Sequence, residues 1–366
     1  MVAAVFAFVG YILNNTLDNL ARRGINTGFA FLNNEAGFGI VQTLIPFTET
    51  DTFGRTFVVG LLNTLLVSFL GVVFATLIGF VIGVARLSKN WLVSQLAGAY
   101  IEIFRNIPLL LQILFWYSAI IPLLPHPRQS LAIGEAVFLN KRGLFLPKPI
   151  PEDGFSWVMI ALAIAIVAVI LVRRWARVRQ DRTGQPFHTG WTTLGLLVGL
   201  PTAAFLATGL PLHWEFATMG GFNFSGGLTI IPELGALTLA LSIYTAAFIA
   251  EIVRSGIQAV SHGQTEAAYA LGLRPGTTMR LVIIPQAMRV IIPQLTSQYL
   301  NLTKNSSLAT AIGYPDLVAV FAGTTLNQTG QAVEIIFITM MVYLVISLAI
   351  SLGMNLYNKK MALVER

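Results

Sequence analysis

Two apolar segments of this chain carry polar side chains at helical spacing. In the segment at 91–123 these residues are Glu102, Arg105, Asn106 and Gln112. In the segment at 294–321 they include Asn301, Lys304, Asn305 and Ser306. An ionisable group inside a membrane-spanning helix is costly unless it faces protein, water or a partner, so these residues indicate a polar pathway. Lys304 or Arg105 can meet a carboxylate there, and Glu102 can meet an ammonium, which suits a zwitterionic solute.

A structural role is the alternative for both sets. Glu102 and Arg105 are three residues apart and can form an ion pair, and the amides and hydroxyls near Lys304 can hold helices together. Glu251 and Arg254 are also three residues apart, at the end of another apolar segment. We expect this second pair to order an adjoining loop or a gate rather than to contact solute.

The residue patterns typical of metal or covalent chemistry are missing from the sequence. It has no cysteine, and its four histidines lie in or beside predicted loops, without paired spacing inside a span. No carboxylate cluster converges at one depth, so the chain is not expected to be an enzyme. No GxxxxGK[ST] motif occurs either, so any ATP that drives the protein must bind to another chain.

Composition identifies a multi-pass membrane protein. Of the 366 residues 55% are hydrophobic and only 11% are charged, far from the balance of a soluble domain. The net charge is +7, but the cations lie in short loops between apolar runs rather than in a patch with interleaved aromatic residues. That distribution is typical of membrane topology and argues against a nucleic-acid partner.

About eight membrane-spanning helices are predicted. Residues 1–13 are too few for a full span, since roughly 20 apolar residues are needed. There are three interpretations of them: a short helix that continues to about Leu20, a start codon placed too far downstream, or a signal peptide. The other predicted spans are 57–85, 91–123, 155–172, 191–210, 232–260, 294–321 and 335–356.

The distribution of Lys and Arg sets the orientation. Of 23 such residues, 14 fall in loops that this arrangement places in the cytosol, including five in the short loop at 173–182. Arg105 and Lys304 lie within spans. The C-terminus is therefore predicted to be cytosolic. Seven cations are predicted to be external: Arg22, Arg23, Arg55, Arg128, Lys141, Arg142 and Lys148.

A polar hairpin at 261–293 separates two of the long spans. Ser261 and Gln264 have the spacing of a capping box, Gly272 can end a first short helix, and the turn at 273–276 reverses the chain. Thr277 or Thr278 can then cap a second helix, which Pro285 is expected to interrupt. The segment reads as a docking element on the cytosolic face, and an ordinary interfacial hairpin is the alternative.

The residues of this hairpin resemble the EAA loop of ABC-importer permeases. The family pattern is EAA, three residues, Gly, nine residues and Ile-x-Leu-Pro. It is matched here by Glu266, Ala267, Ala268, Gly272 and Pro285, with Val282 and Ile284 as conservative replacements. The resemblance implies a coupling helix that inserts into a cleft of a cytosolic ATPase, with Arg274 and Pro275 in its turn.

Three further stretches resemble landmarks of permeases for polar amino acids. They are FRNIPLLLQ at 104–112, AAFIAEIVRSGI at 246–257 and KNSSLATAIG at 304–313. With the EAA loop they cover 57–123 and 231–356, the five-helix core of permeases for histidine, glutamate, glutamine, arginine or opines. The extra spans and the long N-terminal part resemble the larger permease subunits of general L-amino-acid importers.

The resemblance implies four domains and a complete importer. Residues 1–56 form a short membrane helix and an external segment, 57–123 and 231–366 form the two parts of the core, and 124–230 is an insertion. The implied partners are a cytosolic ABC ATPase dimer that binds ATP and Mg, a second and different permease, an external solute-binding protein and the amino acid. The implied location is a bacterial inner membrane, and no cofactor is expected on this chain.

A secondary transporter driven by an ion gradient is the alternative function. It would also need intramembrane charges and polar stripes. It would have no use for a cytosolic EAA hairpin, however, and the sequence shows no inverted repeat. An ATP-driven amino-acid importer is therefore the favoured interpretation.

Overall fold

The fold is known from a computed structural model, which describes residues 27–221 and 223–361 together with isolated positions before residue 27. The predicted short helix at 1–20 lies outside the continuous described ranges. The chain divides into two compact units. One contains residues 1–124 and 231–366, and the other contains residues 125–230.

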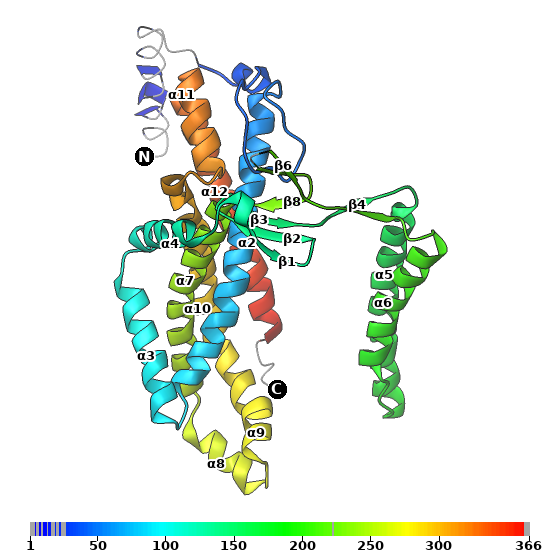
Figure 1. The fold of residues 1–366 in the computed structure, drawn as a ribbon. Coiled ribbons are helices and arrows are strands. Elements are labelled where there is room, and N and C mark those ends of the chain that lie inside the picture. The colour runs from blue at the N-terminus through cyan, green and yellow to red at the C-terminus, as the bar shows by residue number, and fades with distance from the viewer. Residues whose placement is uncertain are drawn as a thin grey trace. The chain divides into compact units, whose positions relative to one another are not determined.

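The first unit is helical. Its elements include η1 (Ala30–Asn33), α2 (Phe53–Arg86), α3 (Trp91–Asn106), α4 (Leu109–Leu123), α7 (Pro232–Gln258), α8 (His262–Ala270), α9 (Pro275–Thr278), a π-helical η3 (Met279–Ile283), α10 (Ile284–Asn305), a 3-10 helix η4 (Ser306–Ile312), a π-helical η5 (Val318–Thr325), α11 (Leu326–Thr329) and α12 (Ala332–Met361). In Figure 1, α2, α7 and α10 run alongside one another, and α8 and α9 lie beyond their ends.

Helix α7 lies at the centre of this unit because small residues let its neighbours approach. A Cβ added at Gly79 of α2 would lie 2.6 Å from Cβ of Ile249, and one added at Gly83 would lie 2.6 Å from the carbonyl oxygen of Ala250. Inside a membrane such close backbone contact replaces the hydrophobic effect as the source of helix association. The glycines of α2 therefore fix the α2–α7 pair.

The predicted span at 91–123 is not one straight helix. The axes of α3 and α4 meet at 106°, and the break falls at Ile107 and Pro108. Proline cannot continue the backbone hydrogen bonding and forces the preceding residue into an extended conformation. The amide of Gln112 then donates to the carbonyl oxygens of Phe104 and Ile107, at 2.9 Å each. Its role at this bend was not predicted.

The predicted span at 294–321 is also wrong. Helix α10 starts ten residues earlier, at Ile284, and ends at Asn305. The 3-10 segment η4 follows, and Gly313, with φ at +76°, ends it before η5 begins at Val318. A left-handed conformation at this position suits glycine, which has no Cβ to clash. The polar residues from Ser306 onward thus belong to a break between helices.

Residues 27–52 cover one end of the helical unit. Phe31 is buried against Phe53, Phe321 and Ile335. The backbone N–H of Gly28 donates to Glu334 at 2.6 Å. Buried Asn63 of α2 donates to the carbonyl oxygens of Gln42 and Pro315, at 2.9 and 2.8 Å. This segment is therefore packed onto the helices rather than free of them.

The second unit combines two apolar helices with small sheets. Its elements are η2 (Pro127–Gln129), β1 (Leu131–Ile133), β2 (Val137–Asn140), β3 (Gly143–Leu146), β4 (Lys148–Pro151), α5 (Phe155–Thr183), α6 (Thr189–Ala207), β5 (Leu212–Glu215), β6 (Thr218–Gly220), β7 (Asn223–Ser225) and β8 (Leu228–Ile230). The strands form an antiparallel sheet in the order β1-β2-β3-β8 and the pairs β4-β5 and β6-β7.

These strands lie where the sequence predicts only loops. Phe224 stacks with Phe138 at a centroid distance of 4.6 Å and contacts Phe145 at 5.0 Å, so the two predicted loops share a small aromatic core. Helix α5 also extends through the arginine cluster at 173–182, which had been placed in a loop.

Five single helices of the described residues are long and apolar enough to cross a bilayer, namely α2, α5, α6, α7 and α12. The bent pair α3 and α4 makes a sixth if it is one span. Helix α10 does not qualify by this measure. The mostly helical, multi-pass architecture is therefore confirmed.

Candidate functional site

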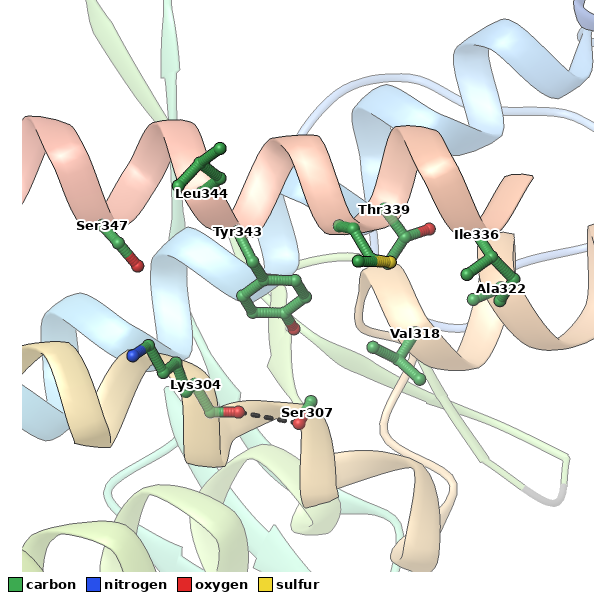
Figure 2. A pocket seen from close by; sticks show the side chains of 10 residues that line it. Lys304, Ser307, Val318, Ala322, Ile336, Thr339, Tyr343, Leu344 and Ser347 are labelled. Carbon is green, nitrogen blue, oxygen red and sulfur yellow. Dashed lines mark hydrogen bonds between the residues drawn. The ribbon is translucent and has the colours of Figure 1, made fainter. Parts of the chain in front are cut away.

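Lys304 lines an open pocket of about 550 Å³ in the helical unit. Figure 2 shows Lys304 and Ser307 on one side of it and Thr339, Tyr343 and Ser347 of α12 on the other. The hydroxyl of Ser307 donates to the carbonyl oxygen of Lys304 at 2.7 Å. The pocket thus offers an ammonium, several hydroxyls and an apolar wall.

The neighbours of Lys304 in the sequence lie in different surroundings. Asn301 is exposed and Asn305 is half-buried, and neither lines the pocket. Ser306 is fully buried, and its hydroxyl donates to the carbonyl oxygen of Thr303 at 2.8 Å. The predicted polar stripe is therefore divided between an open pocket and the packed interior.

The polar residues of α3 do not form the ion pair that the sequence allowed. The side-chain amide of Asn106 donates to the carboxylate of Glu102 at 3.4 Å. The same amide donates to the backbone carbonyl oxygen of Glu102 at 2.7 Å. The guanidinium of Arg105 lies 5.2 Å from the ring centroid of Phe248 on α7, a cation–π contact. Both charged side chains are exposed, so their charges stay available at the surface of the unit.

The two polar stripes are not brought into one cavity. The residues lining the Lys304 pocket come from α10, η4, η5 and α12, and none comes from 91–123. Gln112 is 4% exposed and engaged at the bend. The carboxylate of Glu102 and the ammonium of Lys304 therefore do not enclose a common solute position in this conformation.

Glu251 and Arg254 form the predicted pair at the end of α7. The guanidinium donates through Nε at 2.9 Å to one carboxylate oxygen and through a second nitrogen to the other, and it also contacts Gln258. A bidentate pair of this kind has a fixed geometry. It holds the last turns of α7 directly before the hairpin.

The predicted first helix of the hairpin is confirmed. Helix α8 ends at Ala270, and Gly272 follows with φ at +76°. The N–H of Gly272 donates to Tyr269 at 2.9 Å, and that of Leu273 donates to Ala268 at 3.1 Å. This is a Schellman motif, which satisfies the last carbonyls of the helix.

Other local details differ from the prediction. Ser261 precedes α8 without a side-chain cap, and Gln264 instead accepts a hydrogen bond from Gln286 of α10 at 3.0 Å. The second helix starts at Pro275, with Arg274 rather than a threonine at its N-cap. Pro285 does not interrupt it, because the π-helical turn η3 precedes the proline and α10 continues.

The hairpin turns most of its motif residues to the outside. Ala268 is buried, whereas Glu266, Ala267, Gly272 and Arg274 are exposed. Apolar side chains are exposed beside them, with Leu271 at 81% and Leu281 at 63%. The exposure of four apolar side chains of the hairpin was not predicted, namely those of Tyr269, Leu271, Met279 and Leu281. Large apolar residues in a segment that is expected to lie outside the lipid could have indicated it.

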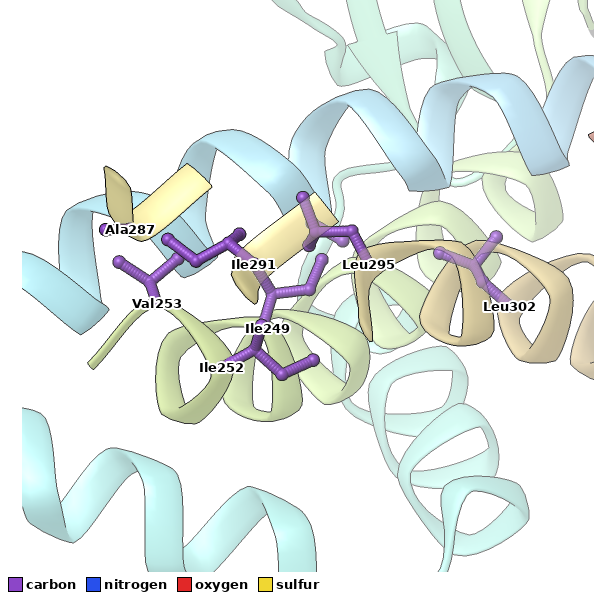
Figure 3. Close-up of a cluster of buried hydrophobic side chains, with 8 residues drawn as sticks. Ile249, Ile252, Val253, Ala287, Ile291, Leu295 and Leu302 are labelled. Atoms are coloured by element: carbon purple, nitrogen blue, oxygen red, sulfur yellow. The ribbon is translucent and has the colours of Figure 1, made fainter. Parts of the chain in front are cut away.

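A packed core connects this hairpin to the membrane helices. Figure 3 shows Ile249, Ile252 and Val253 of α7 facing Ala287, Ile291 and Leu295 of α10. The side chains of Ile291, Ile249 and Val253 are almost fully buried. Because α10 continues directly from α9 and η3, this core connects the hairpin to α7.

Comparison with known proteins is consistent with a single family. Residues 187–363 match the family model described as "Binding-protein-dependent transport system inner membrane component". The chain is 58% identical over its whole length to YhdX of Escherichia coli (strain K12), covering 93% of that protein. It is 55% identical, again over its whole length, to the general L-amino acid transport system permease protein AapQ of Rhizobium johnstonii, covering 91% of it.

A third relative has a more specific name. It is the glutamate/glutamine/aspartate/asparagine transport system permease protein BztB of Rhodobacter capsulatus. The two sequences are 46% identical over an alignment that covers 97% of this chain and 90% of BztB. The names of these relatives lend no support to the alternative of a gradient-driven transporter.

Proposed function

Because this chain belongs to the binding-protein-dependent ABC importer permeases for amino acids, we propose that residues 261–293 dock onto the cytosolic ATPase and pass its movement to the core helices. As a permease subunit of this family the chain is a translocation component of the inner membrane and not itself the ATPase. The single observation that carries the docking proposal is the exposed surface of the hairpin.

That surface has the composition of an interface. Leu271, at the C-cap of α8, is 81% exposed, and Tyr269, Met279 and Leu281 of the same hairpin are exposed as well. Glu266 and Arg274 are exposed on the same hairpin and supply charges of both signs at its border. An apolar centre with a polar rim is the usual anatomy of a protein interface.

Glu251 and Arg254 have a positioning role in this proposal. Their bidentate pair fixes the last turns of α7, so that the hairpin starts from a defined direction. The packed side chains between α7 and α10 supply the second connection. The hairpin then moves with the core as one body when the ATPase dimer closes on ATP and Mg.

For the translocation pathway we propose Lys304 as the residue of this chain that meets the carboxylate of the solute. What supports this is the exposure of Lys304 in an open pocket that also presents Ser307, Thr339 and Tyr343. Glu102, Arg105 and Asn106 are proposed to line a separate part of the route, at the surface of α3. Asn301 and Asn305 are proposed to border the pathway.

Two of the predicted pathway residues take a structural role in this proposal. Gln112 holds the bend between α3 and α4, and Ser306 is bonded inside the packed unit. Both side chains are buried, so neither presents a polar group to a solute. The pathway proposal therefore does not depend on them.

The finer description of the importer is also a proposal. We propose that the chain pairs with a related but different permease, receives general L-amino acids from an external solute-binding protein, and has a cytosolic C-terminus. The family description supports the solute-binding protein, the name of AapQ supports general L-amino acids, and the positive residues Lys359 and Lys360 support the cytosolic C-terminus. The different partner permease rests on the extra spans and long N-terminal part of the sequence. Residues 124–230 are proposed as an insertion, in keeping with the compact unit at 125–230.

Gly272→Asp tests the docking proposal. The carboxylate would lie on the exposed turn of the hairpin, where docking would bury it without a partner, at a cost of several kcal/mol. We expect transport and amino-acid-stimulated ATP hydrolysis by the purified complex to fall at least about tenfold, which corresponds to about 1.4 kcal/mol.

Gly184→Asp is the matched control for that experiment. Gly184 also follows a helix, has φ at +67° and has no atom within 4 Å of an added Cβ. It therefore carries the same strain and the same charge but lies outside the hairpin. Equal losses in the two variants, or unchanged hydrolysis in Gly272→Asp, would remove the docking assignment.

Lys304→Met tests the pathway proposal separately. The substitution keeps the length of the side chain and removes its charge, so we expect uptake to fall while the permease still co-purifies with its ATPase. Loss of assembly in this variant, with uptake lost only as a consequence, would assign Lys304 to helix packing instead.

A further inference from the structure

The C-terminal part of α5 carries a concentration of positive charge within a continuous helix. Five arginines lie between residues 173 and 182, whereas the preceding part of the helix, residues 155–172, contains no charged residue. The sequence predicts a short loop for these arginines, but they belong to the helix up to its last turn. Their heights along the helix axis are therefore set by helix geometry.

Three of these arginines lie at the depth of lipid headgroups. The uncharged residues 155–172 span about 27 Å at 1.5 Å per residue, close to the roughly 30 Å of a hydrocarbon core. The polar zone beyond that core is roughly 5 to 7 Å thick on each side. Along the helix axis Arg173, Arg174 and Arg177 lie about 2, 3 and 8 Å beyond the uncharged part, and the last two arginines lie about 11 and 15 Å beyond it.

Two exposed tryptophans mark the same depth independently. Trp175 of α5 is 52% exposed, and Trp191, near the start of α6, is 76% exposed. The two helices run alongside each other in Figure 1, and Nε of Arg173 donates to the hydroxyl of Thr193 on α6 at 3.3 Å. Tryptophan is enriched where the hydrocarbon core meets the headgroups. Both helices therefore place this boundary at the level of the first arginines.

Two of the arginines at headgroup depth have no partner within the described part of the chain. Arg174 and Arg177 are exposed there and form neither a side-chain hydrogen bond nor an ion pair. Asp181 follows Arg177 by four residues, the spacing of a helical ion pair, yet it is not among the ion pairs of the described residues. The two guanidinium charges are therefore not compensated by this chain.

Neither membrane topology nor the helix dipole requires cations at this depth. Positive residues within about 15 to 20 residues of the end of a span favour a cytosolic position, and Arg179 and Arg182 meet that condition. The favourable interaction with the helix dipole is confined to the last turn, which ends at Thr183 and contains Arg182. Arg174 and Arg177 precede that turn, so their position needs another explanation.

We propose that Arg174 and Arg177, with Arg173 beside them, bind headgroup phosphates of anionic phospholipids in the leaflet that the predicted orientation places on the cytosolic side. With 3.6 residues per turn, the three side chains fall within an arc of about 100° on one face of α5. A guanidinium group offers paired donors to phosphate oxygens and stays charged at physiological pH. Basic clusters next to a span attract anionic lipids.

The bound lipids would fix the depth of the α5–α6 pair. The most apolar windows of these helices are only 11% and 0% buried inside the protein, so contacts within the described residues do little to hold them at one height. Phosphates that pair with the arginines would resist movement of α5 along the membrane normal. This lipid site is independent of the docking surface and of the amino acid that is carried.

The test uses the importer complex, purified with its co-expressed partners, in bilayers of phosphatidylglycerol and phosphatidylcholine in equal amounts. The lipid that stays with the complex after extraction and washing is quantified by mass spectrometry. R174Q should lower the retained phosphatidylglycerol about fivefold and R174Q/R177Q about 25-fold, since each basic residue near an anionic surface contributes about a factor of five. Retained phosphatidylcholine should not change.

R182Q is the matched control. Arg182 is an exposed arginine of the same helix, but it lies about 15 Å beyond the uncharged part, roughly one screening length past the headgroups at physiological ionic strength. Its loss should change the retained phosphatidylglycerol by less than about twofold. R174Q and R182Q alter the net charge and the topological signal equally, so a difference between them reports charge at headgroup depth.

A conservative variant guards against a defect in folding. R174K keeps the charge and should retain phosphatidylglycerol to within about twofold of the unsubstituted complex. Size-exclusion chromatography verifies that each variant assembles with its partners. If R174Q does not assemble, R177Q replaces it, and the same fivefold fall is expected.

Three outcomes would overturn the proposal. The first is an equal fall in R174Q and R182Q, or no fall in either, because charge at headgroup depth would then have no special effect. The second is release of phosphatidylglycerol by millimolar inorganic phosphate, which would make the arginines a site for free anions. The third is unchanged lipid retention in R174Q/R177Q together with loss of a co-purifying partner, which would assign the arginines to an acidic protein surface.

Discussion

Helices α5 and α7 are both apolar enough to cross a bilayer, but their surroundings are opposite. In α7, 72% of the most apolar window is buried inside the protein, whereas the values for α5 and α6 are 11% and 0%. Yet the most apolar window of α5 has a higher mean hydropathy than that of α7. Apolarity therefore does not measure burial in a membrane protein, because lipid is as apolar as a leucine side chain.

What distinguishes α7 is close packing against small residues. Gly79 and Gly83 of α2 leave no space for a side chain at the α7 surface, whereas Gly195 and Gly199 of α6 have no atom within 4 Å of an added Cβ. The same residue type thus fixes a helix pair in one unit and is unconstrained in the other. We expect substitutions to be costly around α7 and to have little effect on the outer faces of α5 and α6.

The largest expected effect is that of Gly83→Leu. Its Cβ would lie 2.6 Å from the carbonyl oxygen of Ala250 and 2.8 Å from Cβ of Val253, so α2 and α7 must separate. Overpacking of this kind costs about 1 to 3 kcal/mol or more. We expect the midpoint of thermal unfolding in detergent to fall by several degrees and the yield of intact complex to drop.

Gly199→Leu adds the same side chain to α6, where the structure leaves space for it. Its unfolding midpoint should match that of the unsubstituted protein. If Gly199→Leu were as destabilising as Gly83→Leu, the outer face of α6 would have to be packed against a partner, and the contrast between the two units would disappear.

The second effect concerns buried hydrogen bonds. Asn63→Ala would leave the carbonyl oxygens of Gln42 and Pro315 without their donor in the buried base of the segment at 27–52. An unsatisfied buried polar group costs about 1 to 3 kcal/mol. We expect faster proteolysis within residues 34–47, measured on the intact complex, together with a lower unfolding midpoint.

Thr193→Ala instead removes a side-chain hydrogen bond between α5 and α6. The hydroxyl of Thr193 accepts from Nε of Arg173 at 3.3 Å, and both groups are near water. Exposed contacts of this kind contribute about 0 to 1 kcal/mol. A larger loss of stability for Thr193→Ala than for Asn63→Ala would contradict the ranking of the two units.

The sequence was sufficient for the class of fold and for the first helix of the hairpin at 261–293, because both depend on local patterns. Long apolar runs locate α2, α5, α7 and α12, and the Gly272 turn follows from the lack of a Cβ at one residue. The bend at Pro108 was harder to predict. A proline inside an apolar run can either kink a helix or end it, and the outcome depends on whether Gln112 can satisfy the freed carbonyls.

The positions of the proposed pathway residues could not be predicted for a related reason. Spacing puts Asn301, Lys304 and Asn305 on one side of a continuous helix, but α10 ends at Asn305 and Ser306 begins a 3-10 helix, so the predicted stripe does not continue along one helix. The strands of the second unit were missed because β1 to β8 are only three or four residues long. Strands that short carry too little alternation to be distinguished from loops.

The smallest expected effect separates packing from hydrophobic transfer. Val67 of α2 is fully buried and Val198 of α6 is 55% exposed, and both are replaced by alanine. In water, burial of two methyl groups would contribute about 1.6 kcal/mol by transfer alone. Within a membrane that contribution vanishes, because the separated helices also lie in apolar surroundings. Only the cavity and the lost dispersion contacts remain for Val67→Ala, which we expect to cost about 1 kcal/mol.

Val198→Ala should leave the unfolding midpoint unchanged, since lipid chains refill the space. A full transfer cost at Val67 would show that water, rather than lipid, surrounds the unfolded state of α2.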